Sequence, residues 1–206
     1  MSSGVPVHVI VAVFEDGSGA SNALQALRAS QTRALVGIVD AAVIVRGAHG
    51  TLELRETAAR ERRRFALSPV AAGVVAMVTG PDVGESAGGA LFQDLARRLT
   101  DGGFPAAPLR DAAAELAGCS SVLVVVAETA WTGAVAADLS REASIVVVEG
   151  LPGDLARELG AAGELVYTAD REGRPLLVEQ RAPGASPASS QAGGLVEPPV
   201  PPDPAA

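Results

Sequence analysis

The chain has 206 residues, of which 48% are hydrophobic and 3% aromatic, so it can bury a sizeable core built from Val, Leu, Ile and Ala. Its net charge of −8 argues against general nucleic-acid binding and against docking on anionic lipid, since both need a basic face. The sequence contains no lysine, which excludes a Schiff-base lysine and a P-loop lysine.

The chain begins with an alternation of strand and helix signals. Val5 to Phe14 is a β-branched run typical of a buried strand. An apolar stripe at helical spacing follows from Ala23 to Leu27, and Ala41 to Arg46 then predicts a second strand. Residues 51–56 alternate leucine with charged side chains, which predicts a strand with one exposed face.

The middle of the chain, 58–103, is predicted to be helical. Residues 58–65 contain the charged run RERRR and suggest a solvated helix. Ser68 followed by Pro69 is a favourable helix start, and the apolar helix that follows should end at Gly80. A second, amphipathic helix should complete this segment.

The second half repeats the pattern of the first. Ser121 to Ala127 predicts a buried strand, Thr129 to Arg141 a helix, and Ser144 to Glu149 another strand. After a short helix, two further strands are expected at 165–169 and 176–179.

The last segment, 181–206, is rich in Pro, Gly, Ala and Ser and predicts a disordered or polyproline tail. A solvated terminus is the simpler interpretation. The alternative is a proline-rich peptide that docks on a protein partner.

These patterns predict an α+β fold. Two strand-helix-strand units, at about 5–57 and 104–180, are joined by the helical segment 58–103 in a single domain, 1–180. If the two units share one antiparallel sheet, they form a ferredoxin-like split β-α-β plait with additional helices in the middle. Helices would cover one sheet face, and the middle helices or a second copy of the chain would cover the other.

The sequence also suggests a compartment. Cys119 is the one cysteine, so no disulfide within the chain is possible. The start, Met1 to Gly4, lacks the positive region of a signal peptide. No uncharged apolar run reaches the ~20 residues of a membrane span. We therefore expect a cytoplasmic protein with no integral membrane span.

Histidine and cysteine occur too sparsely to suggest a catalytic or metal centre. His8 lies among valines in the first strand, where a histidine with a satisfied hydrogen bond is the simpler interpretation and a functional base the alternative. His49 belongs to a predicted hairpin turn, and Cys119 suggests an inert thiol. We expect no metal and no cofactor, because two histidines without a nearby acidic pair match no known zinc spacing.

Two glycine-rich segments and one basic cluster are weak candidates for anion binding. Residues 15–21 follow a strand and open a helix, but Glu15 and Asp16 would repel phosphate. Residues 84–89 likewise lack a basic partner. The basic cluster consists of Arg60, Arg62, Arg63 and Arg64. It is expected to be a solvated face, with a contact to an acidic partner as the alternative.

Glu128 and Trp131 are the most informative pair. Glu128 follows a predicted strand, and the single tryptophan lies one turn into the next helix. In the simpler interpretation Trp131 anchors this helix on the sheet and Glu128 caps it near the positive end of the helix dipole. The alternative is a ligand cleft or a subunit contact around Trp131.

Several segments resemble the bacterial domain-of-unknown-function 1269 family. The similar segments are Val9–Phe14, Ala20–Leu27 and GIVDAAVIVRGAHGTLELRET at Gly37–Thr57. VVVAETAWTGAVA, at Val124–Ala136, is similar to a related actinobacterial pattern of strand, Glu, Trp and helix. The resemblance covers roughly 5–57 and 104–165, and implies a fold and a bacterial stress or housekeeping context but no reaction.

The family's middle stretch is often longer, glycine-rich and membrane-like, whereas here Pro81, Asp82 and Glu85 interrupt it. The resemblance therefore gives no reason to expect membrane association.

Three functions are compatible with these patterns. The preferred hypothesis is a non-enzymatic, oligomer-forming protein that associates with itself as a homodimer or higher oligomer. The second is a regulatory module that binds a small molecule near Trp131 or at a dimer interface. The third is a dimeric enzyme that uses His8 and a carboxylate as acid and base.

Overall fold

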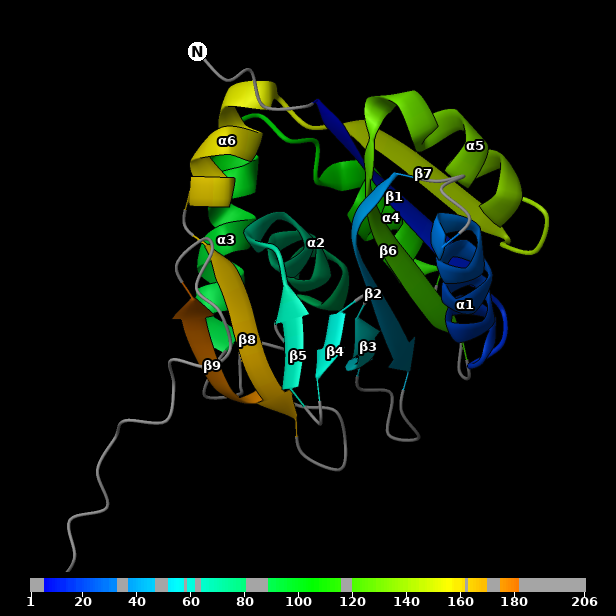
Figure 1. The fold of residues 1–206 in the computed structure, drawn as a ribbon, viewed down its shortest axis with the longest axis horizontal. Helices are drawn as coiled ribbons and strands as arrows, with labels where there is room; N and C mark the ends of the chain where they lie inside the picture. The colour runs from blue at the N-terminus through cyan, green and yellow to red at the C-terminus, as the bar shows by residue number, and fades with distance from the viewer. Residues whose placement is uncertain are drawn as a thin grey trace, which may run out of the picture.

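The computed structural model describes residues 6–32, 37–46, 52–57, 59–61, 64–80, 89–115, 120–161, 163–169 and 175–181. It has a mixed α+β fold, in which a five-stranded antiparallel sheet lies between two sets of helices and a second, four-stranded sheet lies to one side (Figure 1).

The five-stranded sheet has the order β3-β2-β6-β1-β7. Its strands are β1 (Val7–Phe14), β2 (Ile38–Arg46), β3 (Leu52–Thr57), β6 (Ser121–Glu128) and β7 (Ile145–Gly150). β1 pairs with β6 along its whole length, and β2 and β7 pair on the outer sides of this central pair. The two strand-helix-strand units therefore interleave in one sheet, which confirms that part of the sequence prediction.

Both faces of the central strands β1 and β6 are buried, which explains their unbroken apolar runs. Alternate β1 side chains enter two different cores: Val9, Val11 and Val13 pack in one, and Ile10, Ala12 and Phe14 in the other. An antiparallel sheet more often exposes one face, and here separate helices cover each face.

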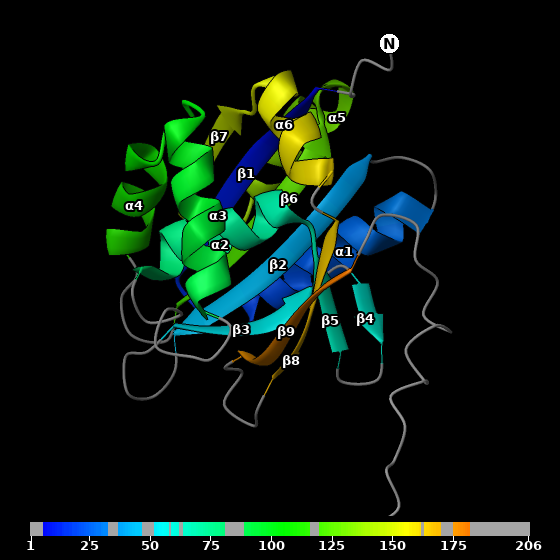
Figure 2. The same ribbon diagram turned by 90° about the vertical axis from the view of Figure 1, so that its left-hand side faces the viewer.

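Two helices cover one face, and four helices lie on the other (Figures 1 and 2). The first set is α1 (Gly19–Thr32) and α5 (Thr129–Leu139). The second set is α2 (Pro69–Thr79), α3 (Gly89–Asp101), α4 (Ala107–Ala114) and α6 (Gly153–Ala161). The sequence left two possibilities for the second face, which could be covered by the middle helices or by a second copy of the chain. In the structure, helices of the chain itself cover it.

Helix α2 is the centre of the larger core. All eleven of its residues are buried, because it packs against the sheet, against α3, α4 and α6, and against β5 and β8. Ser68 caps its start by accepting a hydrogen bond from the backbone N–H of Ala71 at 3.2 Å, and Pro69 occupies the first turn. Gly80 ends it with a φ of 64°. These boundaries confirm the predicted start and end.

The second sheet has the order β4-β5-β8-β9, and its presence corrects one prediction. Its strands are β4 (Ala59–Glu61), β5 (Arg64–Leu67), β8 (Glu164–Ala169) and β9 (Pro175–Arg181). The helix predicted over 58–65 is wrong, because its described residues, 59–61 and 64–65, belong to the paired antiparallel strands β4 and β5. β5 also pairs with β8, which lies about a hundred residues later. Such long-range pairing outweighs the local helix preference of Ala, Glu and Arg.

The strands predicted at 165–169 and 176–179 are present as β8 and β9, but they belong to this second sheet. Among the helices that the structure describes, none has both the length and the apolar composition to cross a bilayer.

Candidate functional site

The three predicted site residues lie at one end of the five-stranded sheet. His8 is the second residue of β1, Glu128 is the last residue of β6, and Trp131 lies in the first turn of α5. The β1-β6 register places Val7 opposite Glu128 and His8 opposite Ala127. The topology therefore brings together residues that are more than a hundred positions apart in the sequence.

His8 is half-buried, and its ring Nδ1 lies 3.2 Å from the hydroxyl of Thr129. That hydroxyl donates its single proton to the carbonyl oxygen of Pro6 at 2.8 Å. The geometry therefore favours the tautomer in which His8 donates from Nδ1 to Thr129. On its other side the ring lies over Gly150, where a Cβ would be 3.5 Å from Nε2.

Replacing Thr129 with Val should destabilise the fold by about 1 kcal/mol, because the isosteric side chain loses both hydrogen bonds to the start of β1. Urea denaturation measures this loss. Thr129→Ser keeps the hydroxyl and should retain most of the stability. Equal stabilities for the Val and Ser variants would show that these two bonds contribute nothing.

Glu128 occupies the N-cap position of α5, but its side chain makes no capping hydrogen bond. The predicted position of Glu128 at the start of the helix is therefore confirmed, although its side chain donates and accepts no capping bond there. Its backbone N–H instead donates to the carbonyl of Gly37 at 3.0 Å, and its carboxylate lies close to the same glycine. Glu128 thus ties the start of α5 to the start of β2.

Trp131 is half-buried and packs against Gly37. A Cβ on this glycine would lie 2.4 Å from the indole Cδ1 and 2.8 Å from Nε1, so only glycine fits beneath the ring. The contact fastens α5 to the sheet, as the simpler interpretation of Trp131 expected. The ligand cleft at Trp131 stays a prediction.

Asp40 is a buried charged residue that was not among the candidates predicted from the sequence. It is 5% exposed and lies beside a bulge in β2. Its Oδ1 accepts from the N–H of Ala41 at 2.8 Å, and its Oδ2 accepts from the N–H of Ser68 at 2.6 Å. Burial raises the pKa of Asp40 to about 6, although the hydrogen bonds from Ser68 and Ala41 oppose this rise. One carboxylate inside the apolar run GIVDAAVIV was the available signal.

The glycine-rich turn before α1 is organised by its own acidic residue. Asp16 accepts hydrogen bonds from the backbone N–H and the hydroxyl of Ser18, at 2.8 and 2.7 Å. The Ser18 side chain and then its backbone hold the pKa of Asp16 below the ordinary aspartate value. The turn therefore carries the negative charge of the Asp16 carboxylate. The expected repulsion of phosphate depends on this charge.

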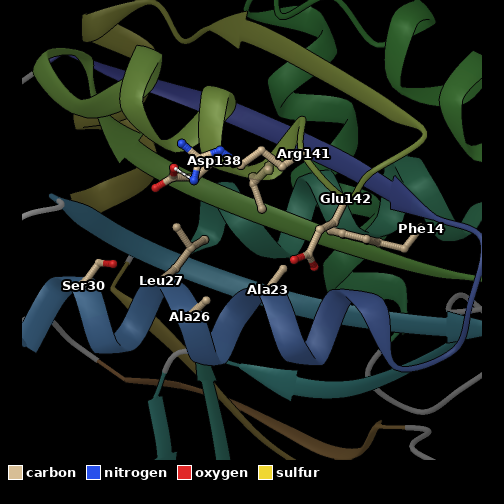
Figure 3. Close-up of a pocket in the computed structure, with 9 residues that line it drawn as sticks. Phe14, Ala23, Ala26, Leu27, Ser30, Asp138, Arg141 and Glu142 are labelled. Atoms are coloured by element: carbon tan, nitrogen blue, oxygen red, sulfur yellow. Dashed lines mark ion pairs between the residues drawn. The ribbon is translucent and has the colours of Figure 1, made fainter.

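A pocket of about 200 Å³ opens between α1 and the end of α5, on the face that these two helices cover (Figure 3). Its buried floor is apolar and consists of Phe14, Ala23, Leu27 and Leu139. Ala26 and Ser30 line it from α1, and Asp138, Arg141 and Glu142 from α5 and the connection that follows. The pocket therefore combines an apolar base with a charged margin.

The pocket margin carries more negative than positive side chains. Arg141 forms an ion pair with Asp138, at 3.3 Å between Nη1 and Oδ1. Figure 3 shows the carboxylate of Glu142 turned towards α1, near Ala23 and away from that pair. Two carboxylates and one guanidinium leave the margin with a formal charge of −1. The pocket was not predictable from the sequence, because its lining comes from three separate segments: the end of β1, α1, and the end of α5 with the connection that follows.

The other predicted candidates fall largely outside the described residues. These are His49, Cys119, Arg62, Arg63, residues 84–88 and the tail after 181. Arg60 lies in β4 and Arg64 in the neighbouring strand β5. Among the described residues, no three His, Cys, Asp or Glu side chains gather as a potential metal site.

Comparison of the chain with protein-family models, with curated proteins and with solved structures finds no match. The resemblance to the domain-of-unknown-function 1269 family therefore stays a prediction.

Proposed function

We propose that this protein is a non-enzymatic cytoplasmic protein that associates with itself through the free edge of β7. The observation behind the proposal is the contrast between the two edges of the five-stranded sheet. β3, at one edge, has the charged sequence LELRET and a bulge in its pairing with β2. Charges and bulges are devices that protect an edge from pairing with another chain.

β7, at the other edge, has the sequence IVVVEG and pairs with β1 without a register shift. Its four consecutive β-branched residues include Val148, which is 39% exposed. Glu149 is its one charged residue, and in the described part of the chain no strand pairs on its outer side. Antiparallel pairing of β7 with β7 of a second copy would satisfy these free backbone groups and reduce the exposure of Val148.

The interleaved strands also support the finer fold assignment. The strand order β2-β6-β1-β7, the antiparallel pairing of neighbours and the connecting helices α1 and α5 favour a ferredoxin-like split β-α-β plait. We propose that fold for this part of the chain, with β3, the second sheet and the middle helices as additions. Joining two such sheets at β7 would give one continuous sheet of ten strands.

Val148→Lys should convert the assembly to monomer and raise its dissociation constant at least about tenfold, because it introduces one positive charge from each copy into the new strand pair, and an edge lysine opposes strand pairing. Size-exclusion chromatography with light scattering, over a range of protein concentrations, measures the change. Val39→Lys is the matched control, since Val39 is a 55% exposed valine on β2. A wild-type chain that stays monomeric at micromolar concentration would refute self-association.

A second candidate function is a regulatory module that binds a small molecule, and the pocket between α1 and α5 favours it. Arg141 and Glu142 belong to the connection that leads into β7. The end of this connection is held by Ser144, whose N–H and hydroxyl both donate to the carbonyl of Val13. A ligand that contacts Glu142 would therefore restrain the chain next to the proposed interface.

A further inference from the structure

We propose that the pocket between α1 and α5 binds a small organic ammonium ion, with its charged nitrogen at Glu142 and its apolar body on the floor formed by Phe14, Leu27 and Leu139. This inference rests on the second candidate function, ligand binding, and does not depend on self-association.

The size and the lining of the pocket define the apolar part of the ligand. An apolar cavity of about 150 Å³ accommodates benzene. A pocket of about 200 Å³ therefore accommodates a body of roughly six to eight carbon atoms together with a small head group. Phe14 and Leu139 are 1% and 3% exposed, so the floor is held firmly by the core. A flat ring or a short alkyl chain fits such a floor.

The charges define the head group. Among the described residues that line the pocket, the one cation, Arg141, is already paired with Asp138, whereas the Glu142 carboxylate faces the space between the two helices (Figure 3). An ammonium ion would meet Glu142 as its counter-ion, and the Ser30 hydroxyl can accept a further hydrogen bond. An anionic ligand would meet a margin with a net negative charge. The net charge of −8 on the whole chain also favours the approach of cations.

The test uses three probes of matched size that differ only in the head group: n-hexylamine, 1-hexanol and hexanoate. Binding to the full chain is followed by chemical-shift changes in two-dimensional NMR spectra at neutral pH. We expect saturable binding of hexylamine at the resonances of α1 and of the end of α5. Its affinity should be at least about tenfold higher than that of hexanol, with no binding of hexanoate.

Two pairs of variants connect the binding to this pocket. Glu142→Gln should reduce the affinity for hexylamine to that for hexanol, whereas Glu158→Gln, on the exposed side of α6, should leave it unchanged. Ala26→Phe should block the pocket and abolish binding, whereas Ala29→Phe, an exposed position on the same helix outside the lining, should not. Because Glu142 and Ala26 are exposed, neither substitution disturbs a core.

The possible results distinguish the ammonium specificity of the pocket from its location and from ligand binding as such. Equal binding of hexylamine and hexanol, unaffected by Glu142→Gln, would overturn the ammonium specificity and leave an apolar binding pocket. Binding that survives Ala26→Phe would overturn the location. The absence of binding by all three probes would overturn both the inference and the candidate function on which it rests.

Discussion

Gly73→Val should destabilise the protein by about 3 kcal/mol, because α2 and α3 cross at this glycine. A Cβ at Gly73 would lie 2.5 Å from Cδ1 of Leu99 and 3.1 Å from the backbone carbonyl of Leu95. The leucine side chain could move only into a core where it is fully buried, and the backbone of α3 would have to shift as well. Chemical denaturation followed by circular dichroism measures the loss.

Gly133→Val is the matched control for this experiment. Gly133 also lies inside a helix, α5, but a Cβ there would meet nothing within 4 Å. The helix preference of valine over glycine should stabilise this variant slightly, by a few tenths of a kcal/mol. If the two variants had equal stability, the close α2-α3 contact would not be a determinant of the fold.

Asp40→Asn should remove a pH dependence of about 3 kcal/mol from the free energy of unfolding. Burial raises the pKa of Asp40 from 3.8 to about 6. Between these values the folded state binds more protons at this site than the unfolded state, so stability falls as the pH rises. The contribution is fully present below about pH 4 and is lost as the pH passes through 6. A rise of about two units corresponds to about 3 kcal/mol.

The measurement compares urea denaturation of the wild type and of Asp40→Asn from pH 4 to pH 7. As the pH rises, the free energy of unfolding of the wild type should fall relative to that of Asp40→Asn. Asp111→Asn, at an exposed position on α4, is the control and should follow the wild type. A constant difference between wild type and Asp40→Asn across this range would mean that the Asp40 carboxyl group does not titrate there.

Asp40 also shows why the candidate sites were only partly predictable. Its partner Ser68 lies 28 residues away, and the bond between them forms because β2 packs beside the start of α2. The sequence contains both residues and a good helix start at Ser68. It does not show which strand that helix start will meet. The helix cap at Ser68 was therefore predictable from the sequence. The hydrogen bond between Ser68 and the buried carboxylate of Asp40 was not.

The same distinction applies to His8, Glu128 and Trp131. The sequence placed His8 inside the first strand, Glu128 after a later strand and Trp131 in the helix that follows, but their common neighbourhood required the β1-β6 register. The α1-α5 pocket was not predictable at all, since its floor and margin come from three separate segments.

The sequence by itself determined the features that depend on neighbouring residues. The β-branched runs at Val7–Phe14 and Ser121–Glu128 specify strands, and Ser68, Pro69 and Gly80 specify the limits of α2. Only the tertiary structure decided that Ala59–Glu61 and Arg64–Leu67 are paired strands, that β8 and β9 join them in a second sheet, and that α2 is buried on all sides. The physical reason is that local preferences amount to less than about 1 kcal/mol per residue. Strand pairing and apolar burial between distant segments exceed them wherever the chain brings such segments together.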